Sequence, residues 1–228
     1  MISPVVEDDR PHSPDQGSGW IETWAFDYFD RVNETHGWVQ LTHQPAAGLA
    51  WYVSATIGPD GRLVIVVDPA LRLQSLKPSL EFRAEGLWAQ HVCETPMEHW
   101  TVGLEAFGVR LDDPTEALVA EAWGDRIGVG LDVEWEAAGQ PVGGHGCFRQ
   151  PCAVSGELLL GDLEFDLQAV GNRYRAWGPD ALAQMAELAP TTVAPDFGTP
   201  VRVLGPMGDV ELHRQLDLSV GWSLRLTA

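Results

Sequence analysis

The densest group of chemically capable side chains lies between residues 87 and 105, in an otherwise apolar stretch. Its candidate catalytic residues are His91, Glu94, Glu98 and His99. A carboxylic acid or an imidazole held in an apolar cavity has a shifted pKa and can deliver a proton. A bend at residues 95–97 separates the two glutamates, so we expect the chain to reverse there and bring His91 and His99 close together on adjacent strands. The alternative is a structural role, in which Glu94, Glu98 and His99 cap a turn.

The same segment raises the question of a metal. His91 and Cys93 face the same way on a strand, and His99 lies on the expected partner strand, which would allow a metal site. No standard zinc spacing is present, however, and the other two cysteines, Cys147 and Cys152, are remote in the sequence. We therefore expect no metal and no cofactor. Cys147 and Cys152 could bridge a loop, although free thiols fit a cytoplasmic chain better.

Two further acidic groups lie on predicted strands. Asp27 shares its strand face with Phe29, which makes it another candidate catalytic acid. Asp132, Glu134 and Glu136 also share one face, but three like charges together are typical of a solvated surface. The sequence contains no Gly-x-Ser-x-Gly elbow, no dinucleotide fingerprint and no His-Glu-x-x-His pair.

Ten tryptophans are the outstanding feature of the composition. They are Trp20, Trp24, Trp38, Trp51, Trp88, Trp100, Trp123, Trp135, Trp177 and Trp222. Indoles have large polarisable faces that suit long conjugated or polycyclic ligands, and they attract cations. Either these side chains fill the core of a large β protein, or several of them line a ligand pocket.

The elements that must position these residues are mostly strands. Short β-like runs are separated by turn signals, and we expect strands at 20–30, 37–43, 49–57, 62–67, 80–84, 87–94, 99–111, 128–136, 152–160, 163–169 and 172–177, with more after 201. Only Glu116–Trp123 and Pro179–Leu188 are expected to be helical. Alternating strands with few helices predict an all-β fold, an antiparallel barrel or a two-sheet sandwich.

Composition narrows the class of protein. The chain has 228 residues, of which 45% are hydrophobic, and its formal net charge is −19. This charge would repel nucleic acid and anionic membranes, and no apolar run could span a bilayer. Residues 1–18 are acidic and proline-bearing without the features of a secretory signal, so we expect a mobile segment followed by one compact β domain at 19–228. Three cysteines agree with a cytoplasmic protein.

Several segments resemble a known family. They are Trp24–Asp27, Gly86–Trp88, Cys93–Gly103, Glu105–Val109, Asp112–Pro114 and Leu131–Glu136. Together they resemble actinobacterial relatives of the hydroxyneurosporene synthase, or carotenoid hydratase, group. The resemblance runs from about Trp20 to Trp177 and implies a lipocalin-like all-β architecture. Characterised members of the wider group act on apolar isoprenoid or polyketide substrates by hydration, ring closure or intramolecular cycloaddition.

The chain departs from this group in two places. The relatives carry an Arg-Asp-His-Ser-Trp-Gly type of segment, whereas residues 173–178 read Arg-Tyr-Arg-Ala-Trp-Gly. The acid and the imidazole of that segment are therefore missing. The relatives also continue into a second lipocalin-like half, whereas only 50 residues follow Gly178 here. Either the second half is abbreviated, with the two halves meeting near residues 140–150, or its strands complete the first half.

These observations lead to two functional hypotheses. The first is a cofactor-free enzyme that hydrates, isomerises or cyclises a bulky terpenoid, polyene or polyketide; the second is a non-catalytic carrier of the same class of ligand. The expected substrate-binding residues are Trp24, Phe26, Trp88, Trp100, Glu105, Trp135, Arg173, Tyr174 and Trp177. The partner is a hydrophobic small molecule, with no nucleic acid and no membrane span, and a homodimer is left open.

Overall fold

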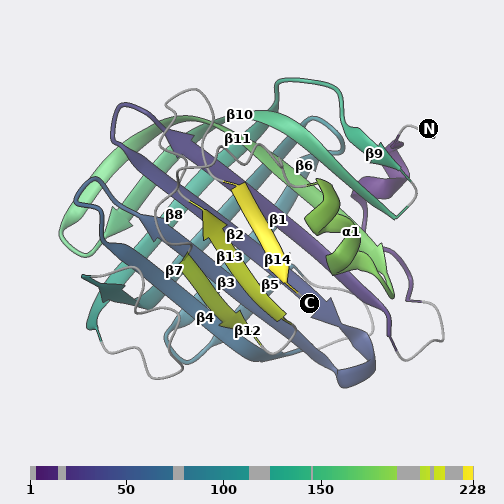
Figure 1. Ribbon diagram of the computed structural model, residues 1–228, viewed down its shortest axis with the longest axis horizontal. Coiled ribbons are helices and arrows are strands. Elements are labelled where there is room, and N and C mark those ends of the chain that lie inside the picture. Colours follow the sequence, from purple (N-terminus) through teal and green to yellow (C-terminus); the bar gives the residue numbers. More distant parts are fainter. Residues whose placement is uncertain are drawn as a thin grey trace.

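The chain folds almost entirely into antiparallel strands (Figure 1). The computed structural model describes residues 4–14, 19–73, 80–112, 124–144, 146–188, 201–205, 208–213 and 223–227. The strands of the large sheet are β1 (Ile21–Asp30), β2 (Thr35–Gln44), β3 (Leu49–Ile57), β4 (Leu63–Arg72), β5 (Glu81–Ala84), β6 (Leu87–Thr95), β7 (His99–Leu111), β8 (Asp125–Ala137), β9 (Val142–Gly144), β10 (Cys147–Leu160) and β11 (Leu163–Gly178). The expected all-β fold is confirmed.

The large sheet closes into a ring. Its strand order is β4-β3-β2-β1-β11-β10-β8-β7, and β7 pairs with β4 again through Val109–Leu111. The earlier part of β7 pairs instead with β6, which in turn pairs with β5. Beyond Ile65, therefore, β4 diverges from β7, and β5 and β6 continue the wall. Among the described strands no ladder joins β4 to β5, which leaves a seam between them.

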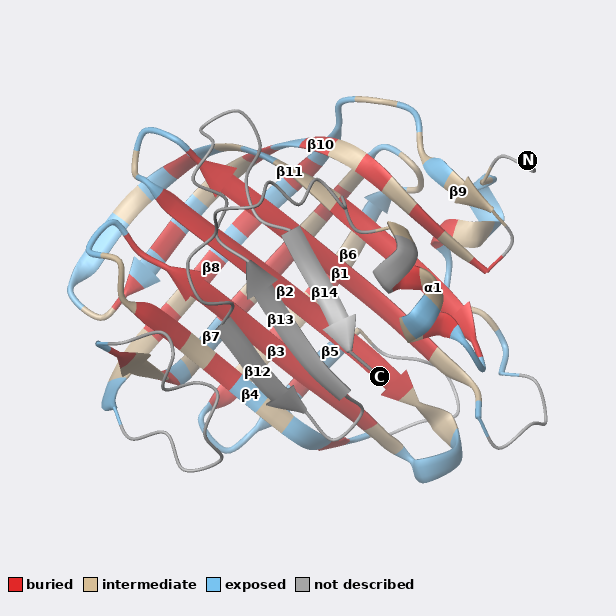
Figure 2. Cartoon of the chain, in the orientation of Figure 1, coloured by how far each residue is buried: buried red, intermediate tan, exposed pale blue. Residues whose placement is uncertain are grey.

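The two sides of the ring differ in how they are covered. Strands β1 to β3 are buried on both faces, because nearly every residue of each is buried. Their inward side chains, such as Trp24 and Phe26, join the core of the barrel. Trp38 and Trp51 belong instead to a second apolar cluster outside it, which also includes Ala181 and Met185 of the helix α1 (Ala181–Leu188). In β8 buried and exposed residues alternate instead, and Figure 2 shows this banding on the strands behind β1 to β3.

The C-terminal strands form a sheet of their own. β12 (Val201–Gly205), β13 (Gly208–His213) and β14 (Ser223–Thr227) pair in that order. The predicted helix at Pro179–Leu188 corresponds to α1, and the one at Glu116–Trp123 lies outside the described residues. The two strands expected at 163–169 and 172–177 are one continuous strand, β11. No helix in the described part of the chain is long and apolar enough to cross a membrane.

Residues 138–146 do not separate two sheets. β8 and β10, which flank this stretch, pair directly from Cys152 opposite Ala137 to Leu160 opposite Val129. The proposed meeting point of two halves therefore falls inside one continuous wall of the ring.

The described part of the N-terminal segment, residues 4–14, packs against the barrel. Val6–Asp9 forms the 3-10 helix η1, and Asp9 is completely buried. His12 stacks on Trp177, with ring centroids 4.1 Å apart. The acidic composition suggested a solvated segment, but the carboxylate of Asp9 finds a buried guanidinium partner, Arg173, in the barrel.

Candidate functional site

The predicted catalytic cluster at 87–105 is split between two faces of the sheet. His91 pairs with Val102, so odd-numbered residues of β6 share a face with even-numbered residues of β7. His91 consequently points into the barrel and His99 points out of it. Glu94 and Glu98 are exposed beside the hairpin turn. The expectation that His91 and His99 come together is therefore wrong.

His91 lies in an aromatic environment inside the barrel. Its ring centroid is 5.3 Å from that of Phe26 and 6.1 Å from that of Tyr52. Neither ring nitrogen has a hydrogen-bond partner among the described residues. Burial, followed by the charge of His43, lowers the pKa of His91 to about 3, so the imidazole is neutral near pH 7.

Two more polar atoms of the barrel core lack a partner in the described part of the chain. They are the Tyr52 hydroxyl and the Trp24 indole nitrogen, and both side chains are 0% exposed. Buried polar groups in proteins are nearly always hydrogen-bonded, to protein or to another molecule. The indole can only donate and the hydroxyl can donate or accept. The interior therefore offers unused hydrogen-bond donors within an aromatic wall.

The exposed fractions of the core side chains differ slightly around the barrel. Trp24, Trp100 and Trp135 are 0% exposed, whereas Phe82 and Leu87 on β5 and β6 are 6% and 7% exposed. On β4, Val66 is 5% exposed. These last three side chains belong to the same interior core and come from the strands that border the seam. His91 lies close to this seam, because its backbone N–H donates to the carbonyl of Leu80, which directly precedes β5.

One end of the barrel is closed by the N-terminal segment. Arg173 pairs with Asp9, and the side chains of both are almost completely buried. The backbone N–H of Met97 donates to Asp9 Oδ2 over 2.6 Å, and Trp100 Nε1 donates to the same oxygen over 3.2 Å. Arg173 also donates from Nε to Gln150 Oε1, at 2.8 Å.

A second buried ion pair lies beside the first. Arg175 donates to Glu22 Oε1 over 2.8 Å, and its guanidinium carbon lies 4.2 Å from the centroid of the Trp24 ring. His12 donates to Glu22 from its backbone nitrogen, and its Nδ1 lies 2.8 Å from the same carboxylate. Burial raises the pKa of Glu22, but the bonds to His12 and the charge of Arg175 outweigh it and hold the pKa below its usual value.

Asp27 forms a separate polar centre on the outer face of β1. Asn172 donates to it from its backbone and its side chain, and the Tyr174 hydroxyl donates to Oδ2 over 2.7 Å. Trp38 packs against Tyr174, with ring centroids 5.3 Å apart. Burial raises the pKa of Asp27 to about 6, although these bonds and the charge of Arg149 oppose the rise.

The opposite wall carries an open groove on its outer face. A cavity of about 430 Å³ there is lined by Trp88 and by the exposed carboxylates Glu105, Asp132, Glu157 and Glu164. Trp88 Nε1 donates to Glu81, and the Trp88 ring lies over Gly103. Trp88 and Glu105 are thus neighbours, as a shared site would require, but they are separated from the interior by the sheet.

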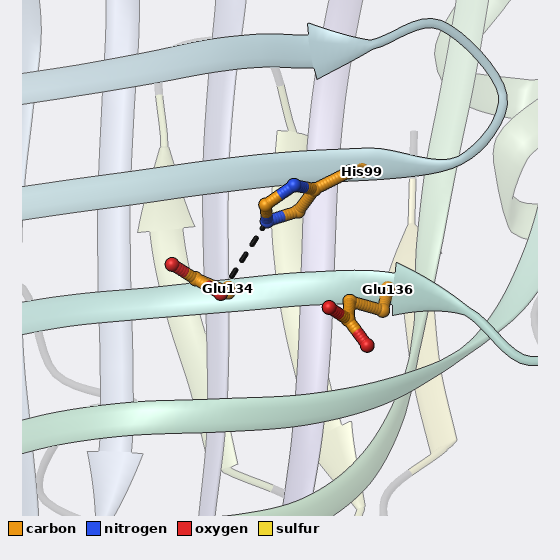
Figure 3. Close-up of side chains that lie close together, drawn as sticks. All are labelled: His99, Glu134 and Glu136. Carbon is orange, nitrogen blue, oxygen red and sulfur yellow. Dashed lines mark ion pairs between the residues drawn. The ribbon is translucent and has the colours of Figure 1, made fainter.

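Three side chains on the outside of β7 and β8 could hold a cation. His99, Glu134 and Glu136 place their ligand atoms within 4.8 Å of one another, and His99 Nε2 lies 3.4 Å from Glu134 Oε2 (Figure 3). Both glutamates are exposed, as the sequence predicted for this face. This group differs from the metal-ligand set that the sequence suggested, which comprised His91, Cys93 and His99.

The structure brings together five of the nine predicted substrate-binding residues inside the barrel. They are Trp24, Phe26, Trp100, Trp135 and Arg173. Trp177 lies at the closed end against His12, and Tyr174 belongs to the Asp27 centre. Sequence reasoning missed Tyr52, which looks like any alternating strand residue, and Asp9, which no local signal distinguishes from its acidic neighbours.

Comparison with known proteins identifies the family of the chain but gives no activity. No curated protein matches the sequence. A family model described as a domain of unknown function (DUF7064) matches residues 5–206, a range that includes Asp9 as well as the barrel. The chain therefore belongs to the DUF7064 family of domains of unknown function.

Proposed function

We propose that this protein binds a mainly apolar small molecule, of the terpenoid, polyene or polyketide class, inside its barrel. The observation that carries the proposal is the buried imidazole of His91, which neighbours Phe26 and Tyr52 and has no hydrogen-bond partner among the residues that the structure describes. A hydroxyl or carbonyl group on the ligand would satisfy His91 and the Tyr52 hydroxyl, while the aromatic walls contact the rest. Small-molecule sites commonly combine apolar walls with a few convergent polar groups.

Carriage is the function that these groups support best. A neutral imidazole with a pKa near 3 hydrogen-bonds a ligand well, but the imidazolium form that would act as a general acid is scarcely populated at pH 7. The predicted donors Glu94 and Glu98 are exposed beside the hairpin, away from the interior. The interior therefore favours binding and release of an unchanged ligand.

A second candidate function, cofactor-free alkene chemistry, rests on Asp27 and would act on a substrate at the outer face of β1 rather than on one inside the barrel. Its raised pKa keeps a fraction of the carboxyl protonated near neutral pH, beside the aromatic rings of Trp38 and Tyr174. In a hydration, the Asp27 proton would add to one alkene carbon, water would add to the resulting cation, and the proton lost by that water would restore the acid. The neighbouring rings would stabilise the cation.

Tryptophan fluorescence tests the binding proposal. Titration with a long polyene should quench emission with a saturable curve, and His91→Leu should weaken binding of a hydroxylated or carbonyl-bearing ligand at least tenfold. Trp88→Phe is the matched control, because Trp88 lies on the outer face, and it should leave affinity unchanged. No saturable quenching by any of several terpenoid and polyene probes would reject the proposal.

Mass spectrometry of the recovered ligand separates the two functions. Carriage predicts that the ligand returns with its mass and retention time unchanged. Alkene chemistry predicts a gain of one water or a rearranged isomer, and a loss of that product in Asp27→Asn with ligand binding intact.

A further inference from the structure

The closed end of the barrel is built as a receptor for a carboxylate. Three donors converge on the carboxyl group of Asp9: the guanidinium of Arg173, the backbone N–H of Met97 and the indole N–H of Trp100. Charge-assisted bonds of this kind are the strong ones in proteins. Asp9 itself is completely buried, so these bonds form away from water.

All three donors belong to the strands and hairpin of the barrel, whereas the acceptor, Asp9, belongs to the N-terminal segment. Met97 and Trp100 come from the hairpin of β6 and β7, and Arg173 comes from β11. Gln150 of β10 fixes the guanidinium through its Oε1, and its own amide donates to the carbonyl of Met97 over 3.0 Å. The donor geometry is therefore set by the strands, whereas Asp9 reaches it from η1, which precedes β1.

The Asp9 carboxylate adjoins the aromatic core of the barrel. The Trp100 ring, whose nitrogen bonds Asp9, lies 5.8 Å from Phe26 between centroids, and Phe26 lies 5.3 Å from His91. A chain that begins at the position of the Asp9 carboxylate could run along these rings towards the seam. An extended apolar molecule with an acidic head fits this path.

We propose that Arg173, Met97 N–H and Trp100 form the head-group site for a long-chain carboxylic acid, and that Asp9 occupies this site until such a ligand displaces it. The inference rests on the proposed function, because the acyl chain needs the barrel interior. Exchange of one carboxylate for another leaves the charge around Arg173 unchanged, so the guanidinium is never buried without a partner. The displaced Asp9 returns to water, where its charge is solvated.

A fluorescent polyene fatty acid, cis-parinaric acid, and its methyl ester provide matched probes. In Asp9→Ala the acid should bind at least tenfold more tightly than in the unaltered protein, because the internal competitor is gone, while affinity for the ester stays within twofold. Glu7→Ala removes an exposed acid from the same segment and should change neither. In the double variant Asp9→Ala with Arg173→Gln, acid and ester should bind equally.

Hydrogen exchange provides a readout that needs no variant. Added acid should speed the exchange of the amides of residues 5–12 in the unaltered protein severalfold, and the ester should not. Ester binding without any acid-specific response would overturn this inference and leave the proposed function standing. Failure of both probes to bind would contradict the proposed function and, with it, this inference.

Discussion

Tyr174 of β11 lies diagonally across from Asp27 of β1, two residues beyond the directly opposite Asn172, and the Tyr174 hydroxyl donates a 2.7 Å hydrogen bond to Asp27 Oδ2. Two bonds from Asn172 reach the same carboxylate. Such bonds favour the ionised form, but burial outweighs them, and the pKa of Asp27 rises to about 6. The carboxyl therefore changes charge within the range of pH in which proteins are ordinarily handled.

Asp27→Asn should remove a pH dependence of stability. The unfolded chain releases this proton near pH 3.8 and the folded chain near 6, so between these values the folded state binds more protons. The free energy of unfolding contributed by Asp27 consequently falls as the pH rises from 4 to 6, by on the order of 2–3 kcal/mol. The denaturant midpoint of the variant, measured at each pH, should rise relative to that of the unaltered protein between pH 4 and 6.

Asp132→Asn is the matched control, because Asp132 is exposed on the outer face of β8. The difference in the free energy of unfolding between this variant and the unaltered protein should stay constant between pH 4 and 6. An equally flat difference for Asp27→Asn would mean that Asp27 is ionised throughout this range.

His91→Phe should have the opposite dependence. The unfolded imidazole titrates near 6.5 and the folded one near 3, so the unfolded state binds more protons in between, and stability is lost as the pH falls through this window. The phenylalanine side chain does not titrate and has no nitrogen that needs a hydrogen-bond partner. The variant should therefore lose less stability between pH 6.5 and 4, as measured by urea denaturation, and His99→Phe on the outer face serves as its control.

Alternation and turn residues were enough to predict most strands. The predicted bounds 49–57 and 99–111 are those of β3 and β7, because apolar or alternating runs extend up to clear turn signals, Gly58-Pro59 after β3 and Asp112-Asp113-Pro114 after β7. The break expected near 170 is absent. Gly171 looked like a turn residue, but it sits within β11 where an added Cβ would lie 2.0 Å from the carbonyl oxygen of Asp27. A glycine required by close strand approach cannot be distinguished locally from one that permits a turn.

The site was less predictable than the fold, for a reason of register. One residue of shift moves a side chain to the other face of a sheet. The sequence spacing of His91 and His99 suggested proximity, and only the pairing of His91 with Val102 shows that they face opposite ways. Asp9 could not have been identified at all, because its burial depends on Arg173, which lies 164 residues later in the chain.

Glu22→Gln should be among the most destabilising single substitutions. It leaves the buried guanidinium of Arg175 without its anionic partner, and breaking a buried ion pair from one side costs about 3–5 kcal/mol. Glu136→Gln, on the exposed face of β8, should change the free energy of unfolding by less than about 0.5 kcal/mol. Thermal or urea unfolding followed by circular dichroism measures both. Equal, small effects would contradict the buried pair.

Gly37→Ala tests how closely the aromatic core approaches the backbone of β2. Gly37 lies opposite Tyr28, and an added Cβ would meet the Tyr28 ring at 2.1 Å. The ring is also tied by its hydroxyl, which lies 2.8 Å from Thr56 Oγ1, so it cannot move without losing that bond. Overpacking of this kind costs about 1–3 kcal/mol, whereas Gly128→Ala, with no atom within 4 Å of its added Cβ, should be nearly neutral.

A double-mutant cycle distinguishes a clash with Tyr28 from a general intolerance of alanine in β2. In a Tyr28→Ala background the ring that meets the new Cβ is gone, so adding Gly37→Ala should cost less than about 0.5 kcal/mol further. Urea denaturation of the four proteins gives the coupling free energy. Additive effects would show that the Tyr28 ring is not what excludes a side chain at residue 37.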